Sequence, residues 1–197
     1  GDRIGALVIE ELENVQDMAN VLKTGCHMQQ NKAWLGRVTQ KIAKYTAMLH
    51  DKGFVHGDLK LRNILVNFGL DPEVYIIDCP DGSIKSGMLF DRGVVKDIAC
   101  LDRTAKEFLS RTQRLKFYKN YKRVDKLSTD DKRMIKRVLT FFEGRSGNAG
   151  FNGEKLTNRL KIPVIFSDRR MLRFIIDVLT VDRSRTKIVC HSCSVYP

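Results

Sequence analysis

The sequence predicts an α+β fold that is mostly helical and has a small β portion. Beyond residue 33, apolar residues recur at three- and four-residue steps over long stretches, which is the spacing of helices with one buried face. Two short apolar runs, 64–66 and 74–77, are rich in β-branched residues and have the length of strands. A chain of 197 residues with 43% hydrophobic composition is long enough for one sizeable domain with its own core.

The N-terminal part is expected to contain a strand, a short helix and one long helix. The apolar run 6–9 is typical of a buried strand that leaves into a polar connection, and residues 15–22 fit a short helix. Apolar side chains line one face of residues 33–52, and Gly53 is expected to end this long helix.

The remainder is expected to be mostly α. A polar loop precedes the strand at 64–66, and a turn at 69–72 separates it from the strand at 74–77. Further helices are predicted at 93–108, 115–121, 129–142 and 168–179. The Gly- and Asn-rich stretch 143–153 indicates a loop or flexible connection rather than a clear domain boundary.

The charge balance favours anionic partners. Lys and Arg outnumber Asp and Glu by 35 to 23, and the net charge of +12 suits nucleotides, nucleic acid, acidic glycolipids or anionic membrane surfaces. No apolar run approaches the roughly 20 residues that span a bilayer, and the N-terminus lacks signal-peptide features. We therefore expect a soluble or peripherally attached protein. A reducing compartment is expected from an odd cysteine count without the spacing of a secreted disulfide scaffold: Cys26, Cys79, Cys100, Cys190 and Cys193.

Three oxygen-bearing side chains form the pattern that points to chemistry. Asp58 and Asn63 lie five residues apart in a loop between the long helix and a strand, and Asp78 ends the next strand. Phosphoryl transfer needs a carboxylate that orients and deprotonates the attacking hydroxyl, together with hard oxygen ligands for Mg²⁺. Asp58 is thus the predicted base, and Asn63 and Asp78 are the predicted metal ligands.

Two neighbouring residues have supporting roles in this prediction. Lys60 lies two residues beyond Asp58, where its ammonium group can offset charge on the transferring phosphoryl oxygens. His56 is expected to bond backbone carbonyls and to pack under the loop rather than to transfer protons.

Four segments resemble known kinase motifs. Residues 56–66 resemble a kinase catalytic loop in its His-Gly-Asp form, and residues 75–78 resemble the metal-binding strand end. Residues 96–101 and 114–121 most closely resemble the lipopolysaccharide kinase family, which phosphorylates Kdo or heptose in the inner core. The resemblance covers roughly residues 6–143.

The resemblance implies a protein-kinase-like C-terminal lobe that uses ATP and Mg²⁺. Glu10, Glu11 and Leu12 then correspond to the hinge whose backbone meets adenine, and Asp97 to the helix aspartate that braces the catalytic loop. The implied boundaries are a last N-lobe strand and hinge at 1–12, the C-terminal lobe at 13–180 and a tail at 181–197. The implied acceptor is an anionic glycolipid or phosphosugar at the cytoplasmic face of the inner membrane, with peripheral contact to anionic lipid.

The sequence also departs from the common kinase pattern. Asp78 is followed by Cys79-Pro80 instead of Phe-Gly, and proline fixes φ where glycine would be free. Lys96 follows Asp78 by only 18 positions, without an Ala-Pro-Glu element. Both features favour small acceptors over protein substrates. The glycine-rich phosphate cover and strand lysine of an N-lobe are expected to be missing from this sequence. The sequence is then either a fragment of a longer enzyme, which the missing initiator Met favours, or an isolated lobe that is not expected to be active alone.

Weaker signals have plainer explanations. The C-x-x-C of Cys190 and Cys193 suits half of a zinc site, but an unstructured tail is the default expectation. The basic stretch 111–126 contains aromatic residues, as in RNA-binding segments, but their helical spacing favours packing with a solvated basic face. Binding of nucleic acid is therefore not expected, whereas contact with phosphorylated sugars or an anionic membrane stays open.

Two alternative functions stay open from the sequence. An atypical serine/threonine kinase of the RIO type or a related one also carries a His-Gly-Asp loop and a short segment after the metal-binding aspartate. A nucleotide-binding pseudokinase scaffold is the other alternative, although a scaffold has no chemical need for Asp58, Asn63 and Asp78 together.

Overall fold

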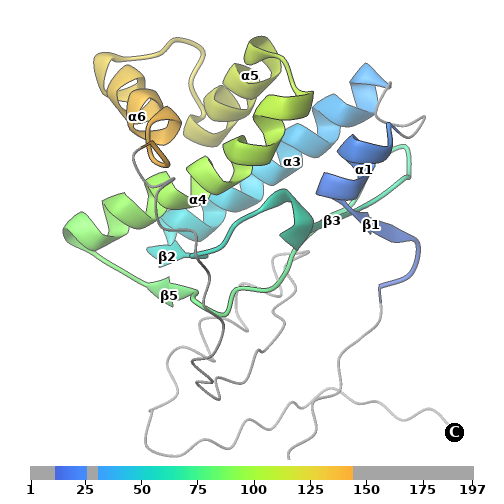
Figure 1. Cartoon of the computed structure of the whole chain (residues 1–197), viewed down its shortest axis with the longest axis horizontal. Helices are drawn as coiled ribbons and strands as arrows, with labels where there is room; N and C mark the ends of the chain where they lie inside the picture. Colours follow the sequence, from blue (N-terminus) through green and yellow to red (C-terminus); the bar gives the residue numbers. More distant parts are fainter. Residues whose placement is uncertain (1–11, 26–30, 144–197) are drawn as a thin grey trace, which may run out of the picture. The chain divides into compact units, whose positions relative to one another are not determined.

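The computed structural model describes residues 12–25 and 31–143 (Figure 1). The helices and strands of this part follow in chain order as β1 (Val15–Asp17), α1 (Met18–Thr24), α3 (Lys32–Asp51), β2 (Phe54–Val55), the 3-10 helix η1 (Leu61–Asn63), β3 (Ile64–Asn67), β4 (Val74–Ile76), β5 (Ser83–Ile84), α4 (Gly87–Phe108), α5 (Arg111–Lys122) and α6 (Thr129–Leu139). Helices dominate and the strands are short. The predicted class, mostly α with a small β portion, is confirmed.

The strands form two small antiparallel sheets. One has the order β1-β3-β4, with Ile64 opposite Ile76, and the other pairs β2 with β5. Because β3 and β4 run antiparallel, the start of β3 lies at the same end of the sheet as the end of β4. Residues just before β3 and just after β4 are therefore brought together.

The long helix α3 anchors the helical core. It begins at the cap residue Asn31, whose side-chain oxygen accepts hydrogen bonds from the amides of Ala33 and Trp34, both at 3.1 Å. Helix α3 packs against α5, and α4 packs against α6. In Figure 1, α5 and α6 lie on the upper side of α4, while β2 and β5 lie below it.

Side chains of α3 and α4 share one buried apolar cluster. Ala43 and Ala47 of α3 are buried in one cluster with Val95 and Ala99 of α4, and with Tyr121 of α5. Each fully buried Val or larger aliphatic side chain contributes about 1.5–3 kcal/mol from apolar area removed from water. This cluster fixes α4, and hence Asp97 on α4, relative to the end of α3.

The structure confirms the long helix and corrects several other elements. The helix predicted at 33–52 is α3, but residues 15–17 of the predicted helix at 15–22 form strand β1, because they pair with β3. Residues 54–55, predicted as the start of a polar loop, form strand β2 through pairing with β5. Helix α4 begins at Gly87 rather than at residue 93.

Several sequence predictions fall outside the described residues. They are the strand at 6–9, the hinge residues Glu10 and Glu11, the helix at 168–179 and the Cys190/Cys193 pair. Leu12 is the first described residue and is half-buried. Over the ranges 12–25 and 31–143, no helix is both long and apolar enough to cross a membrane.

Candidate active site

A buried carboxylate on α4 accepts hydrogen bonds from the loop that carries Asp58. Asp97 is fully buried, and its Oδ2 accepts a hydrogen bond from the His56 amide at 2.7 Å while its Oδ1 accepts one from the Gly57 amide at 2.9 Å. Charge-assisted hydrogen bonds of this kind are roughly twice as strong as neutral ones. Asp97 therefore fixes the backbone immediately before Asp58.

His56 joins the catalytic loop to the end of β4. Its ring is fully buried, with Nε2 3.1 Å from the Ile77 carbonyl oxygen and Nδ1 3.3 Å from the Asp58 amide nitrogen. A carbonyl only accepts and an amide only donates, so the ring is the neutral tautomer with its proton on Nε2. Burial lowers the pKa of His56 below its ordinary value, against the nearby carboxylate of Asp97.

The Asp58 carboxylate lies among cations. Its Oδ1 is 2.6 Å from Lys60 Nζ and its Oδ2 is 3.7 Å from Arg62 Nη2. The side chain is 25% exposed, which leaves it accessible to a hydroxyl group. A phosphoryl group that reaches a hydroxyl at Asp58 would thus lie close to the Lys60 ammonium group.

Asn63, just before β3, and Asp78, two residues after β4, lie at the same end of the β1-β3-β4 sheet. The Ile77 amide donates to the Asn63 carbonyl at 3.0 Å, continuing the ladder that pairs Ile64 with Ile76. The Asn63 side-chain nitrogen donates to the Asp58 carbonyl at 2.9 Å. This bond uses the nitrogen of the amide, so Oδ1 is the end of Asn63 that a metal would bind.

The pair fits the ligand needs of Mg²⁺. This ion is usually bound by one or two protein oxygens together with substrate phosphates and waters. Asp78 has φ +59°, and a non-glycine residue in this left-handed region is uncommon and often functional. In the described part of the chain, no three His, Cys, Asp or Glu side chains form a dedicated metal site.

A tight turn fixes the chain directly after Asp78. The Gly82 amide donates to the Cys79 carbonyl at 3.0 Å, which closes a four-residue turn with Pro80 at its second position. A Cβ on Gly57, which has φ +84°, would lie 2.9 Å from the Asp81 Cβ and 3.0 Å from the Asp81 carbonyl oxygen. The turn therefore packs directly on the catalytic loop, and β5 then pairs with β2.

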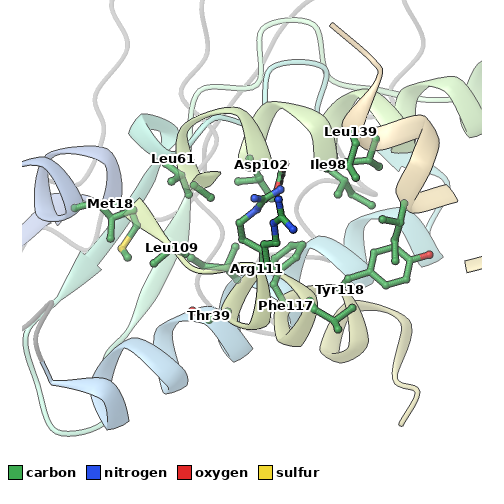
Figure 2. A pocket seen from close by; sticks show the side chains of 18 residues that line it. Met18, Thr39, Leu61, Ile98, Asp102, Leu109, Arg111, Phe117, Tyr118 and Leu139 are labelled. Carbon is green, nitrogen blue, oxygen red and sulfur yellow. Dashed lines mark hydrogen bonds and ion pairs between the residues drawn. The ribbon is translucent and has the colours of Figure 1, made fainter. Parts of the chain in front are cut away.

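The structure also contains a cavity apart from these residues. It has a volume of about 530 Å³ and lies among α1 and α3 to α6. Figure 2 shows apolar side chains such as Met18 and Leu109 around it, with Asp102 among them. Asp102 binds Arg114 through two hydrogen bonds, at 2.6 and 2.8 Å. None of the predicted site residues lines this cavity.

A comparison with models of protein families shows to which family the chain belongs. The model described as "Lipopolysaccharide kinase (Kdo/WaaP) family" matches residues 1–121. The chain belongs to this family. A comparison with curated proteins gave no match. Membership of the lipopolysaccharide kinase family supports a phosphotransferase. The matched residues include Asp58, Asn63, Asp78 and Asp97.

Sequence reasoning missed two buried residues of this lipopolysaccharide kinase site. His50, in the last turn of α3, has its Nε2 3.3 Å from Asp97 Oδ2 and its Nδ1 2.8 Å from the Tyr121 hydroxyl. A single histidine on a mostly apolar helix face gives no signal of such a bond. The contact joins residues 71 positions apart, which no local pattern reveals.

Proposed function

We propose that this member of the lipopolysaccharide kinase family transfers the γ-phosphate of ATP to a sugar hydroxyl of the lipopolysaccharide inner core, on Kdo or heptose. Family membership supports phosphoryl transfer. The observation that supports the proposal is a pair of hydrogen bonds: Asn63 Nδ2 donates to the Asp58 backbone carbonyl, and the amide of Ile77, the residue before Asp78, donates to the Asn63 carbonyl.

The proposed base is Asp58. Its carboxylate accepts the proton of the acceptor hydroxyl as that oxygen forms a bond to the γ-phosphorus. The bond between the γ-phosphorus and the bridging oxygen breaks, and ADP leaves with the bonding electrons. The backbone of this loop is fixed by Asp97 and His56, so Asp58 needs little reorganisation when the acceptor binds.

Asn63 and Asp78 are the proposed ligands of Mg²⁺, which when bound neutralises charge on the ATP phosphates. Lys60, 2.6 Å from Asp58 in the structure, is proposed to meet the transferring phosphoryl oxygens. Glu10, Glu11 and Leu12 stay predictions from the resemblance as the backbone contacts of adenine.

A small or glycolipid acceptor is supported by the segment after Asp78. The turn closed by Gly82 and the pairing of β5 with β2 occupy residues 79–84, immediately before α4 begins at Gly87. The chain between Asp78 and α4 is thus short, and it is hydrogen-bonded to β2, which directly precedes the catalytic loop. Protein kinases use a long segment at this place to seat a peptide, and nothing comparable in length lies between β4 and α4.

The charge distribution supports peripheral contact with an anionic membrane at its cytoplasmic face. Residues 111–139, which contain α5 and α6, hold eleven Lys and Arg against three Asp, whereas residues 1–110 hold fourteen against fifteen Asp and Glu. The excess positive charge is therefore concentrated outside the catalytic loop region. Each Lys or Arg near an anionic bilayer contributes about 1 kcal/mol.

The acceptor is tested with the full-length protein and labelled ATP. We expect label in dephosphorylated core lipopolysaccharide and little in generic protein acceptors. Removal of Mg²⁺ with a chelator should abolish the transfer. Label in a protein or ribosomal fraction with none in lipopolysaccharide would reject the acceptor in favour of the RIO-type alternative. Nucleotide binding without any transfer would favour the pseudokinase.

A further inference from the structure

A chain of buried hydrogen bonds runs from α5 to the catalytic loop. The Tyr121 hydroxyl lies 2.8 Å from His50 Nδ1, and His50 Nε2 lies 3.3 Å from Asp97 Oδ2. Asp97 in turn accepts the amides of His56 and Gly57, at 2.7 and 2.9 Å. The chain thus connects helices α5, α3 and α4 to the two residues immediately before Asp58.

The donors and acceptors in this series of hydrogen bonds are consistent with donation from Tyr121 to His50 and from His50 to Asp97. Asp97 Oδ2 is an acceptor, so His50 Nε2 carries a proton when it bonds there. In the neutral ring, Nδ1 then has a free lone pair, and the Tyr121 hydroxyl donates to it. Asp97 therefore sets the tautomer of His50, and the Tyr121 hydroxyl holds the orientation of the His50 ring.

Tyr121 itself is held firmly. It is 8% exposed, its ring stacks on Phe117 with centroids 6.5 Å apart, and it meets the His50 ring edge-on at 84°. Burial raises the pKa of Tyr121 well above its ordinary value, so the hydroxyl keeps its proton. The Tyr121 hydroxyl can therefore donate a hydrogen bond over the whole pH range in which an enzyme works.

We propose that Tyr121 is a positioning residue for phosphoryl transfer, which acts through His50 and Asp97 to hold the backbone amides of the catalytic loop. The inference rests on the proposed role of Asp58 only for its effect on rate. Oδ2 of Asp97 serves both His50 and His56, so a His50 ring that turns away removes one of the three hydrogen bonds that orient this carboxylate. A less firmly oriented carboxylate would loosen the amides of His56 and Gly57 together.

The same helix offers a matched control. Tyr118 is also buried on α5 and also donates one hydrogen bond, at 3.1 Å, but its acceptor is Asp131 at the start of α6. Tyr121→Phe and Tyr118→Phe each remove one buried hydroxyl and keep the ring. Only the first removes a bond that leads to Asp97.

The test combines amide hydrogen exchange with kinetics. For Tyr121→Phe we expect about tenfold faster exchange at the His56 and Gly57 amides, with no change at the β3 amide of Val66. We also expect kcat to fall about tenfold while KM for ATP stays the same, because the variant displaces the base and leaves nucleotide contacts intact. Tyr118→Phe should change neither readout.

Any of three exchange results would overturn the inference: unchanged exchange at His56 and Gly57 in Tyr121→Phe, an equal increase in Tyr118→Phe, or a uniform increase across the whole chain. A kcat that is unchanged despite faster exchange at these amides would also reject the positioning role. Exchange is measured without substrate. Failure of the proposed function, seen as no transfer by the unsubstituted protein, is therefore distinguishable from failure of this inference.

Discussion

Gly57 occupies a position that only glycine fits. Its φ of +84° is strained for any side chain, and an added Cβ would overlap the backbone of Asp81. We predict that Gly57→Ala lowers the free energy of unfolding by about 1–3 kcal/mol and abolishes activity, because the loop and the turn after Asp78 must separate. Urea denaturation and the transfer assay measure both effects.

Gly36 supplies the control for that substitution. It lies inside α3, and an added Cβ would meet nothing within 4 Å. Gly36→Ala should stabilise the protein by roughly 0.5–1 kcal/mol, since alanine loses less conformational freedom in a helix. Equal stability changes in the two variants would contradict the packing of the turn on the catalytic loop.

His56 makes stability depend on pH in a defined direction. Its pKa in the folded protein is lowered from 6.5, so below about pH 6.5 the unfolded chain binds the proton more readily. The contribution is complete above this pH and is lost as the pH falls toward the folded pKa, by up to about 1.4 kcal/mol per pH unit. At pH values well above 6.5, His56 adds no pH dependence to the free energy of unfolding.

The comparison with His56→Gln isolates this effect. The free energy of unfolding, measured with urea, should fall more between about pH 7.5 and about pH 5.5 in the unsubstituted protein than in the variant. Identical pH dependence in both proteins would mean that His56 is not held as a buried neutral ring.

At the scale of elements, helix α6 depends on its first turn. The Ser128 hydroxyl accepts the Asp131 amide at 3.1 Å, and the Asp131 carboxylate accepts the Ser128 amide at 2.9 Å. We predict that Ser128→Ala costs about 1 kcal/mol of stability, because it removes this reciprocal cap. Thr129→Ala, one residue later at an exposed position, should change stability little. A similar loss from both would contradict the capping role.

Elements with their own periodicity could be predicted from the sequence, and elements that exist only through pairing could not. Helix α3 was predicted within a residue at each end because its apolar face repeats over five turns. Strands β1 and β2 have three and two residues and owe their conformation to β3 and β5, which lie far along the chain. Their sequences alone do not distinguish them from a helix start or a loop.

The same distinction between local pattern and tertiary contact applies to the residues of the candidate site. Asp58, Asn63 and Asp78 lie in short motifs, so their convergence could be predicted from spacing between one helix and two strands. His50 and Tyr121 contribute through a contact that depends on how α3 packs against α5. The positive φ of Asp78 likewise has no sequence pattern of its own.

At the scale of the whole molecule, the uneven charge leads to a test of the proposed contact with an anionic membrane. Lys132 and Lys136 on α6 are exposed, and no ion pair in residues 12–25 or 31–143 involves either of them. Reversing both to Glu should weaken binding to vesicles that contain anionic lipid by at least about tenfold. Raised salt should weaken it as well, because exposed charges are screened.

Lys44→Glu with Lys52→Glu is the matched control, since both residues are exposed and the change in net charge is the same. The control pair should alter vesicle binding much less. Equal effects would show that net charge, rather than the α5–α6 surface, governs the attraction. Stronger binding to RNA than to vesicles would assign this surface to a different partner.

The most direct test of the central claim is phosphoryl transfer by Asp58→Asn in the full-length protein, with Asp71→Asn as control. Asp71 is a surface residue with 79% side-chain exposure, so its replacement should leave the rate unchanged. Asp58→Asn keeps the shape of the side chain and removes the base, and we predict a fall in kcat of about 10²- to 10⁴-fold. Equal labelling of lipopolysaccharide by Asp58→Asn and the unsubstituted protein would contradict the account.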